Sequence, residues 1–211
     1  MNEQSSKTPE HQAIYDRLRH MILFGEVLPG QALTILGLKT MLGAGMTPVR
    51  EAIRRLTAEG ALEALGNRRI CVPNVTQETL NQIYFARLAI EPRLGELAVA
   101  NITKDQLKTL AKLDEQVDAA ISAGDINGYL AGNYRFHFTL YDAANAPVLR
   151  NIASSLWLQL GPSLRVVSGR YGTQNLPDEH KDALSALKAK DGAGVARAIE
   201  ADIRQGLSLM R

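Results

Sequence analysis

Two arginines in the segment MTPVREAIRRL, residues 46–56, have the side-chain chemistry needed to contact a nucleic acid. Arg50 and Arg54 stand four residues apart, so on a helix both extend from one face. A guanidinium presents paired donors that match two acceptors of guanine or the oxygens of a phosphate. The apolar residues of the segment recur at helical spacing on the opposite side. The pattern therefore fits a helix that enters a DNA groove, and it also fits a surface helix with a solvated basic stripe.

Neighbouring polar groups would complete such a contact. Thr47 and the amides of the first helical turn suit a phosphate, because these donors have no partner inside the helix. Arg50 would bind a guanine, a contact worth about 1–3 kcal/mol of discrimination. Arg54 or Arg55 would reach the DNA backbone. Three further polar residues form a short turn and would meet the minor groove or flanking phosphates: Asn67, Arg68 and Arg69.

Three helices are predicted before that turn. Apolar residues at spacings of three and four indicate helices over about residues 12–24 and 36–42. Thr47 is placed to cap a third helix, with Pro48 in the first turn, where no backbone donor is lost. This third helix would run to about Glu59.

A β-hairpin is predicted next, because the short apolar runs ALEAL (61–65) and ICV (70–72) flank the turn sequence GNRR. Three helices followed by a hairpin make a winged helix-turn-helix, in which the third helix lies in the major groove. Glu51 and Glu59 are interpreted as solvated residues or as partners of the arginines on that helix.

After the hairpin the pattern becomes purely helical. A long helix of about residues 77–100 contains Pro92, which predicts a kink near residue 88. Thr103 and Gln106 form a capping-box signature for the next helix. Asp191 is a candidate cap for the last helix. The remaining helices are predicted over about residues 125–142, 146–168, 178–189 and 192–209.

The composition agrees with a mainly α fold. The 211 residues are 45% hydrophobic but only 5% aromatic, which is typical of helical chains. We expect a winged helix-turn-helix domain over residues 1–74 and an all-α six-helix bundle over residues 75–211. The first segment carries nine Lys or Arg against seven Asp or Glu, and the second balances fifteen against fifteen. This surplus is small, so a DNA-binding function must rest on where the charges lie.

The sequence also predicts a cytoplasmic protein. Cys71 is the one cysteine, which excludes an internal disulfide and suits a reducing compartment, and its apolar surroundings favour a buried, inert thiol. No segment approaches the ~20 apolar residues of a membrane span. The first residues, MNEQSSKTPEH, lack the apolar core of a signal peptide.

Four polar residues of the helical part could form a second site. Asn133 and His137 are four residues apart and would extend from one helix face. His180 begins a later helix, and Asp202 lies in the last one. A histidine in a helix is more often structural than a ligand, and spacing alone leaves these alternatives open.

Arg87 also has two interpretations. It lies one helical turn from Tyr84 and from Glu91, so it could form a structural ion pair with Glu91. Alternatively, it faces a cavity and grips the carboxylate of a small ligand in a fork. Arg165 is a weaker candidate for the same role, and Trp157 is interpreted as a core residue.

The first part of the chain resembles the DNA-binding domain of the GntR family of bacterial transcription regulators. The motif consists of LPG at 28–30, then TPVREAIRRLTAEGALEAL, then the hairpin. The resemblance implies that Thr47 and Arg50 contact DNA. The family usually has Ser-Arg before the Thr-Pro pair, whereas this chain has Gly45 and Met46. The missing arginine would remove one DNA contact and alter the operator sequence that is recognised.

The second part resembles the effector domain (FCD type) of the FadR subfamily, and its length is similar to that of the VanR-like group. The motifs are NYRFHFTL, the ANAPVL turn and EH before an Ala-Leu helix. The resemblance implies a divalent metal held by Asn133, His137, His180 and Asp202. Asn133 stands where the family has Asp, and Asp202 where it has a third His, so the ligand charge is conserved. This set suits Zn²⁺, Ni²⁺ or Mn²⁺; alternatively, the polar groups bind the effector directly.

Taken together, the resemblances imply a ligand-responsive transcription regulator, not an enzyme, and repression is the expected sign. A homodimer would read a near-palindromic operator, because a two-fold protein matches two-fold DNA. A small organic acid would bind at Arg87, Tyr84 and Arg165, where the family pattern also has an arginine at position 87. Two other classes are alternatives: a metal-dependent hydrolase fused to a DNA-binding module, and an architectural DNA-binding protein without an effector.

Overall fold

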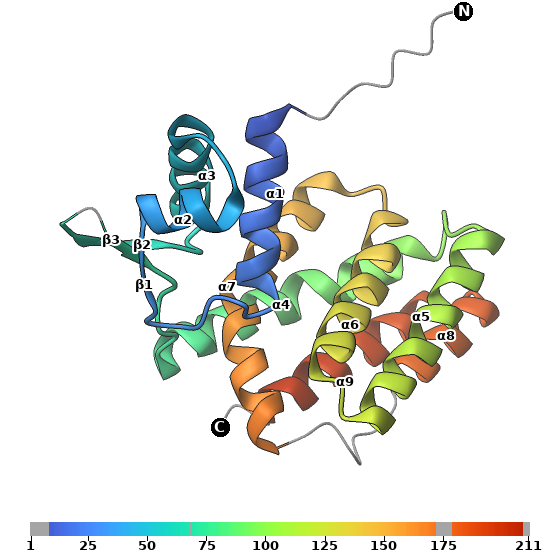
Figure 1. The fold of residues 1–211 in the computed structure, drawn as a ribbon. Coiled ribbons are helices and arrows are strands. Elements are labelled where there is room, and N and C mark those ends of the chain that lie inside the picture. Colours follow the sequence, from blue (N-terminus) through green and yellow to red (C-terminus); the bar gives the residue numbers. More distant parts are fainter. Residues whose placement is uncertain (1–8, 68, 172–178, 209–211) are drawn as a thin grey trace, which may run out of the picture.

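A computed structural model of the protein describes residues 9–67, 69–171 and 179–208, without the side chains of residues 165–171 and 207–208. These residues form a small α/β unit followed by a bundle of helices (Figure 1). The elements, in chain order, are α1 (Glu10–Leu23), β1 (Ala32–Thr34), α2 (Ile35–Leu42), α3 (Met46–Ala58), β2 (Glu63–Gly66), β3 (Arg69–Cys71), α4 (Gln77–Ala98), α5 (Lys104–Ala123), α6 (Ile126–Asp142), α7 (Pro147–Tyr171), α8 (Glu179–Ala189) and α9 (Gly192–Ser208).

The N-terminal unit is a winged helix-turn-helix, as predicted, but its sheet has a strand that the sequence analysis missed. The sheet is antiparallel with the order β1-β3-β2, and Leu33 of β1 pairs with Ile70 of β3. β1 has three residues, too few to show the two-residue periodicity of a strand. It forms because β3, far along the chain, supplies its hydrogen-bonding partner.

The predicted cap of the third helix is wrong. α3 begins at Met46, and its N-cap is Gly45, which has an extended backbone (ψ 161°) and provides no side-chain hydrogen bond. Pro48 lies in the first turn, as expected. Thr47 is therefore inside the helix, and its exposed hydroxyl makes no hydrogen bond with any residue that the structure describes. That hydroxyl remains available to an external partner.

The helical part begins with α4, which runs without interruption through Pro92; the kink near residue 88 stays a prediction. The capping box of α5 is confirmed, since the Thr103 hydroxyl accepts from the Gln106 amide and the Gln106 side chain accepts from the Thr103 amide. Asp191 caps α9 by accepting from the amide of Gly194. These caps satisfy backbone donors that have no partner inside the helix.

α7 joins the two parts of the molecule, because it packs against α1 at one side and α4 at the other (Figure 1). The contact with α1 is close: a Cβ atom at Gly161 would clash with the backbone carbonyl of Leu23. Most of the buried apolar residues form one continuous cluster through both parts. Among the described residues, no helix combines the length and apolar character needed to cross a membrane.

Candidate functional site

The recognition helix, α3, buries one face and exposes the other. Val49, Ala52 and Leu56 are fully buried against the rest of the winged helix. Burial of this stripe fixes the rotation of the helix, so that Arg50 and Thr47 face outward. The Arg50 guanidinium forms no ion pair or hydrogen bond with any part of the chain that the structure describes. It is free to bind an external acceptor.

Arg54 and Arg55 are adjacent in sequence but differ in their contacts. Arg54 is exposed and donates to Glu51, with Nη2 2.7 Å from Oε1, so the predicted pairing of Glu51 is confirmed. This hydrogen bond lowers the pKa of Glu51. The Arg55 guanidinium lies 3.6 Å over the Tyr15 ring, and its Nη1 donates to Gln12. Of these two arginines, Arg54 is therefore the one positioned to exchange its surface partner for a phosphate.

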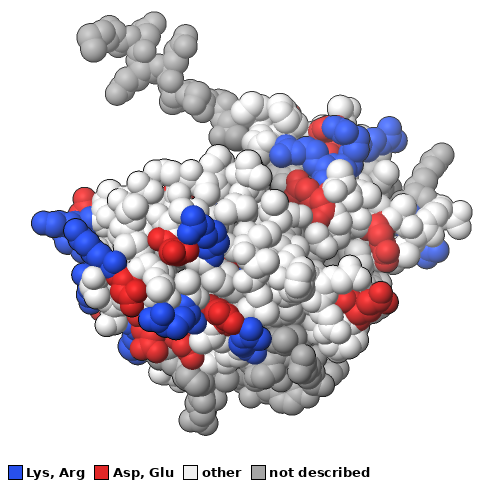
Figure 2. Space-filling model, turned by 180° about the vertical axis from the view of Figure 1, so that it is seen from behind, with Lys and Arg blue, Asp and Glu red and all other residues white. Residues whose placement is uncertain are grey.

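The wing ends in a turn around Asn67, which is exposed and adopts a left-handed backbone (φ 49°) that asparagine tolerates well. The predicted contact Arg68 lies outside the described residues, whereas Arg69 is exposed in β3. Figure 2 shows basic side chains gathered at the upper right, over the end of the molecule that holds α3. On the helical bundle, at the lower left, acidic and basic side chains are mixed. On this face of the molecule, basic side chains therefore gather at the end where DNA contacts are expected.

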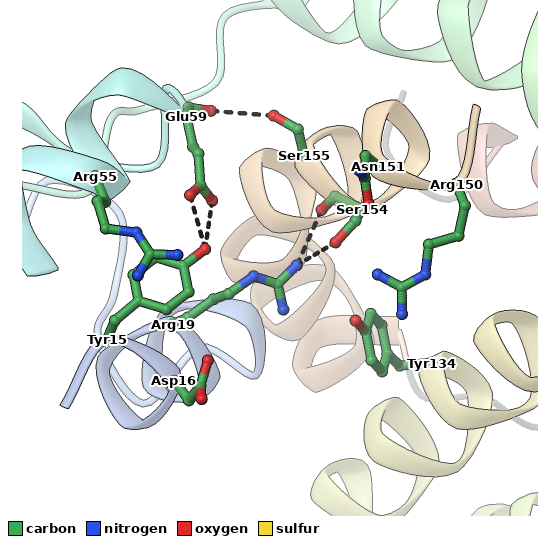
Figure 3. Close-up of a pocket in the computed structure, with 10 residues that line it drawn as sticks. All are labelled: Tyr15, Asp16, Arg19, Arg55, Glu59, Tyr134, Arg150, Asn151, Ser154 and Ser155. Atoms are coloured by element: carbon green, nitrogen blue, oxygen red, sulfur yellow. Dashed lines mark hydrogen bonds between the residues drawn. The ribbon is translucent and has the colours of Figure 1, made fainter. Parts of the chain in front are cut away.

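The C-terminus of the recognition helix docks on α7, across a cavity of about 540 Å³ (Figure 3). The carbonyl oxygen of Glu59 accepts from Ser155 Oγ at 3.2 Å and from Gln159 Nε2 at 3.1 Å. The Glu59 carboxylate accepts from the Tyr15 hydroxyl, a partner that the sequence analysis did not predict. Arg19 joins α1 to α7 by donating to the Ser154 hydroxyl at 2.6 Å.

A second candidate site lies inside the bundle, where His137, His180 and Asp202 converge from α6, α8 and α9. One ligand atom from each lies within 4.8 Å of the others. The Nε2 atoms of both histidines are buried and make no hydrogen bond with the residues that the structure describes, although His137 Nε2 lies 3.1 Å from Asp202 Oδ2. Buried polar atoms are rarely left unpaired in a native protein. Two such atoms beside a carboxylate indicate a site for a cation.

The other ring nitrogens of these histidines have partners. His137 Nδ1 lies 3.0 Å from the Tyr141 hydroxyl, and His180 Nδ1 lies 3.3 Å from Asp114 Oδ1. Metal-binding histidines are oriented by such contacts, which direct the free nitrogen toward the ion. Burial opposes ionisation of Asp202, but the adjacent His137 outweighs it and lowers the pKa of this carboxyl group to about 2. Two imidazoles and an ionised carboxylate fit the divalent ions named above.

Asn133, the fourth predicted ligand, is half-buried one helical turn before His137. Its participation stays a prediction.

Arg87 forms the ion pair that was one of its two interpretations. Its Nε and Nη2 atoms donate to Glu91 Oε1 and Oε2 at 2.6 and 3.2 Å, and both side chains are buried. Burial alone would lower the pKa of Arg87, but the Glu91 carboxylate more than reverses this and raises it. Because Glu91 occupies this fork, an effector could use only the remaining edge of the guanidinium. The Arg87 effector contact stays a prediction.

The two other effector candidates are also untested. Tyr84 is buried beside Arg87, and burial is the main reason why its pKa is raised to about 12. The side chain of Arg165 lies outside the described residues.

Two residues of the site were not predicted: Tyr141 and Asp114. Tyr141 stands four residues after His137 and faces the same way, so the helical spacing could have indicated it. Asp114 is far from His180 in sequence and carried no signal. Trp157 is buried as predicted, and its Nε1 also donates to Glu91 Oε2 at 3.0 Å.

Comparisons with known proteins match both parts of the chain. The model for bacterial regulatory proteins of the gntR family matches residues 10–72, and the FCD domain matches residues 82–205. The HTH-type transcriptional regulator McbR of Escherichia coli (strain K12) is 30% identical over 196 residues, covering 92% of this chain and 89% of that protein. The HTH-type transcriptional repressor RspR of the same strain is 25% identical over 199 residues, covering 93% and 87%. The solved structure of E. coli McbR/YncC has a TM-score of 0.90 at 28% identity, covering 97% of this chain and 98% of that chain.

Proposed function

Because the chain belongs to the GntR family of bacterial regulatory proteins and carries an FCD domain, we propose that it is a homodimeric repressor that responds to a small organic acid. It is a DNA-binding transcription regulator, and the dimer, the repression, the effector and the metal are the proposed parts. The relatives are regulators by name, which favours a sensor over the hydrolase alternative. The bundle of six helices α4–α9 supports the VanR-like group.

The observation that carries DNA recognition is the exposed, unpaired guanidinium of Arg50 on a helix whose opposite face is buried. In a dimer, two such helices would read the two halves of a near-palindromic operator. Thr47, Arg54 and the wing residue Asn67 would hold the backbone on either side. Arg68 belongs to the same proposed contact by its place in the sequence.

The test uses DNA duplexes selected from a random pool by the unmodified protein. Arg50→Ala should weaken binding to the selected duplex at least about 10-fold, since a bidentate arginine–guanine contact contributes about 1–3 kcal/mol. Arg135→Ala is the matched control, because Arg135 is an exposed arginine on α6 of the other part. Equal affinity of the Arg50→Ala protein and the control would refute the proposed recognition.

The cation site supports an effector that carries a carboxylate. Asp202, His137 and His180 would hold the ion, with Asn133 as the proposed fourth ligand. When bound, the ion would supply a Lewis-acidic position for an anionic oxygen. Since the Arg87 fork is filled by Glu91, this position is the better candidate anchor for an organic acid.

Thermal unfolding with zinc tests the site. Ligand at 100 times its dissociation constant stabilises a folded protein by about 2.7 kcal/mol. Zinc should therefore raise the melting temperature of the unmodified protein, and a chelator should reverse the shift. His137→Ala should remove the response, while His20→Ala, which changes an exposed histidine, should retain it. An equal zinc response in both variants would place the binding elsewhere.

α7 physically connects the cation site with the recognition helix. Trp157 on this helix donates to Glu91 beside the cation site, and Ser155 and Gln159 hold the end of the recognition helix. An effector that binds one position of α7 more tightly than another would therefore shift the placement of the DNA-reading helices.

A further inference from the structure

We infer that Tyr141 is a positioning residue that, through its hydrogen bond to Glu91, keeps the hydrogen of His137 on Nδ1 and so reserves Nε2 for a metal ion. The metal part of this inference rests on the proposed function. The hydrogen position rests on the contacts of the buried residues alone and can be tested separately.

The direction of the hydrogen bonds around Glu91 is determined, because its carboxylate can only accept them. Its side chain is fully buried and is paired with Arg87, whose guanidinium is always charged in proteins. Two donors from Arg87, the indole Nε1 of Trp157 and the Tyr141 hydroxyl all converge on its two oxygens. Four donors with a neutralising cation stabilise the ionised carboxylate, which has no hydrogen to give.

The position of the Tyr141 hydrogen follows. Tyr141 Oη lies 2.7 Å from Glu91 Oε2, a separation that two oxygen atoms adopt only with a hydrogen between them. Since the carboxylate has none, the hydrogen comes from Tyr141.

The Tyr141 hydroxyl then requires a hydrogen on Nδ1 of His137. A phenol has a single hydrogen, and Tyr141 has given it to Glu91. The contact of 3.0 Å between Tyr141 Oη and His137 Nδ1 is therefore a bond in which the imidazole donates. In the neutral imidazole this hydrogen leaves the lone pair on Nε2, a buried atom that makes no hydrogen bond with the described residues and lies 3.1 Å from Asp202 Oδ2.

Without Tyr141, the opposite tautomer would be favoured. His137 Nε2 lies 3.1 Å from Asp202 Oδ2, so a hydrogen on Nε2 could bond to that carboxylate. This form would bond Nε2 to Asp202 Oδ2 and would place the imidazole lone pair on Nδ1, away from the proposed metal position. Tyr141 opposes this by giving Nδ1–H an acceptor in a pocket that solvent does not reach. Removing such an orienting partner typically weakens metal binding 10–100-fold.

The test compares Tyr141→Phe with Tyr15→Phe. Tyr15 is also a buried tyrosine whose hydroxyl donates to a glutamate, but it lies in the winged helix. Zinc affinity, measured by competition with a chromogenic chelator, should fall about 10–100-fold for Tyr141→Phe and should not change for Tyr15→Phe. A change of less than about twofold in the Tyr141→Phe protein would overturn the inference, because the expected loss is at least about 10-fold.

Nitrogen NMR of metal-free protein labelled at histidine gives the second readout, because the nitrogen chemical shifts distinguish the two neutral tautomers from each other and from the charged ring. The unmodified protein should carry the His137 hydrogen on Nδ1, and Tyr141→Phe should move it to Nε2. Hydrogen on Nε2 in the unmodified protein would overturn the inference, whether or not the variant folds. Hydrogen on Nδ1 in a protein that takes up no zinc would support the hydrogen position and refute the metal part of the proposed function.

Discussion

Loss of the α3–α7 contact should make the end of the recognition helix open more easily, and the structure allows the change in the free energy of local opening to be estimated. The Glu59 carbonyl is one of the last in its helix, and such carbonyls have no partner inside the helix. Ser155 and Gln159 satisfy it from α7. Each bond contributes about 1 kcal/mol, so Ser155→Ala combined with Gln159→Ala should lower the free energy of local opening by about 2 kcal/mol. This corresponds to about 30-fold faster exchange of the amides that the contact protects.

Hydrogen exchange followed by mass spectrometry measures this directly on peptides from residues 51–62. Peptides from α5, which lies away from the contact, provide the internal reference. The matched control protein carries Ser185→Ala and Gln82→Ala, because both residues are exposed, on α8 and α4, and neither helix packs extensively against α3 or α1. Faster exchange confined to the end of α3 would support the estimate. Unchanged exchange there would show that α7 does not restrain the recognition helix, and the proposed route between the two sites would fail.

Two further outcomes follow from the winged helix. Arg54→Ala should weaken DNA binding by about the same factor for all DNA sequences. It should also reduce the slope of log affinity against log salt concentration by about 1, because each phosphate contact releases counterions from the DNA. An unchanged slope would show that Arg54 does not contact the DNA backbone. The pKa of Tyr15 is raised to about 12, chiefly by burial and then by Glu59, so its stabilising contribution is present below about pH 10 and is lost as the pH rises through 12. Solvent in the adjoining cavity screens this effect to about 1–2 kcal/mol. In urea unfolding between these pH values, the free energy of unfolding should therefore fall less steeply with pH for Tyr15→Phe than for the unmodified protein. An equal decrease in both proteins would contradict this reasoning.

The sequence by itself determined most of the local structure. The apolar spacing of α3 fixed which face is buried, and therefore that Arg50 faces outward, because helical geometry relates the two directly. The capping box of Thr103 and Gln106 and the cap at Asp191 were also readable, since a cap is a contact between residues three apart. The same short range explains the failure at Thr47, where an extended Gly45 lets the helix begin earlier than the side-chain signal suggested.

Only the tertiary structure decided which distant residues meet. Strand β1 forms because β3 pairs with it, and the Glu59 carbonyl is satisfied by a helix almost one hundred positions later in the chain, separations at which periodicity carries no information. Arg87 illustrates the same limit: spacing permitted both an ion pair and a ligand contact, and burial with Glu91, Trp157 and Tyr141 gave the ion pair. His137 and His180 were visible as residue types, but their unpaired Nε2 atoms arise from the packing of α6 against its neighbours. Side-chain chemistry is local to the sequence, whereas burial and partner choice are properties of the packed chain.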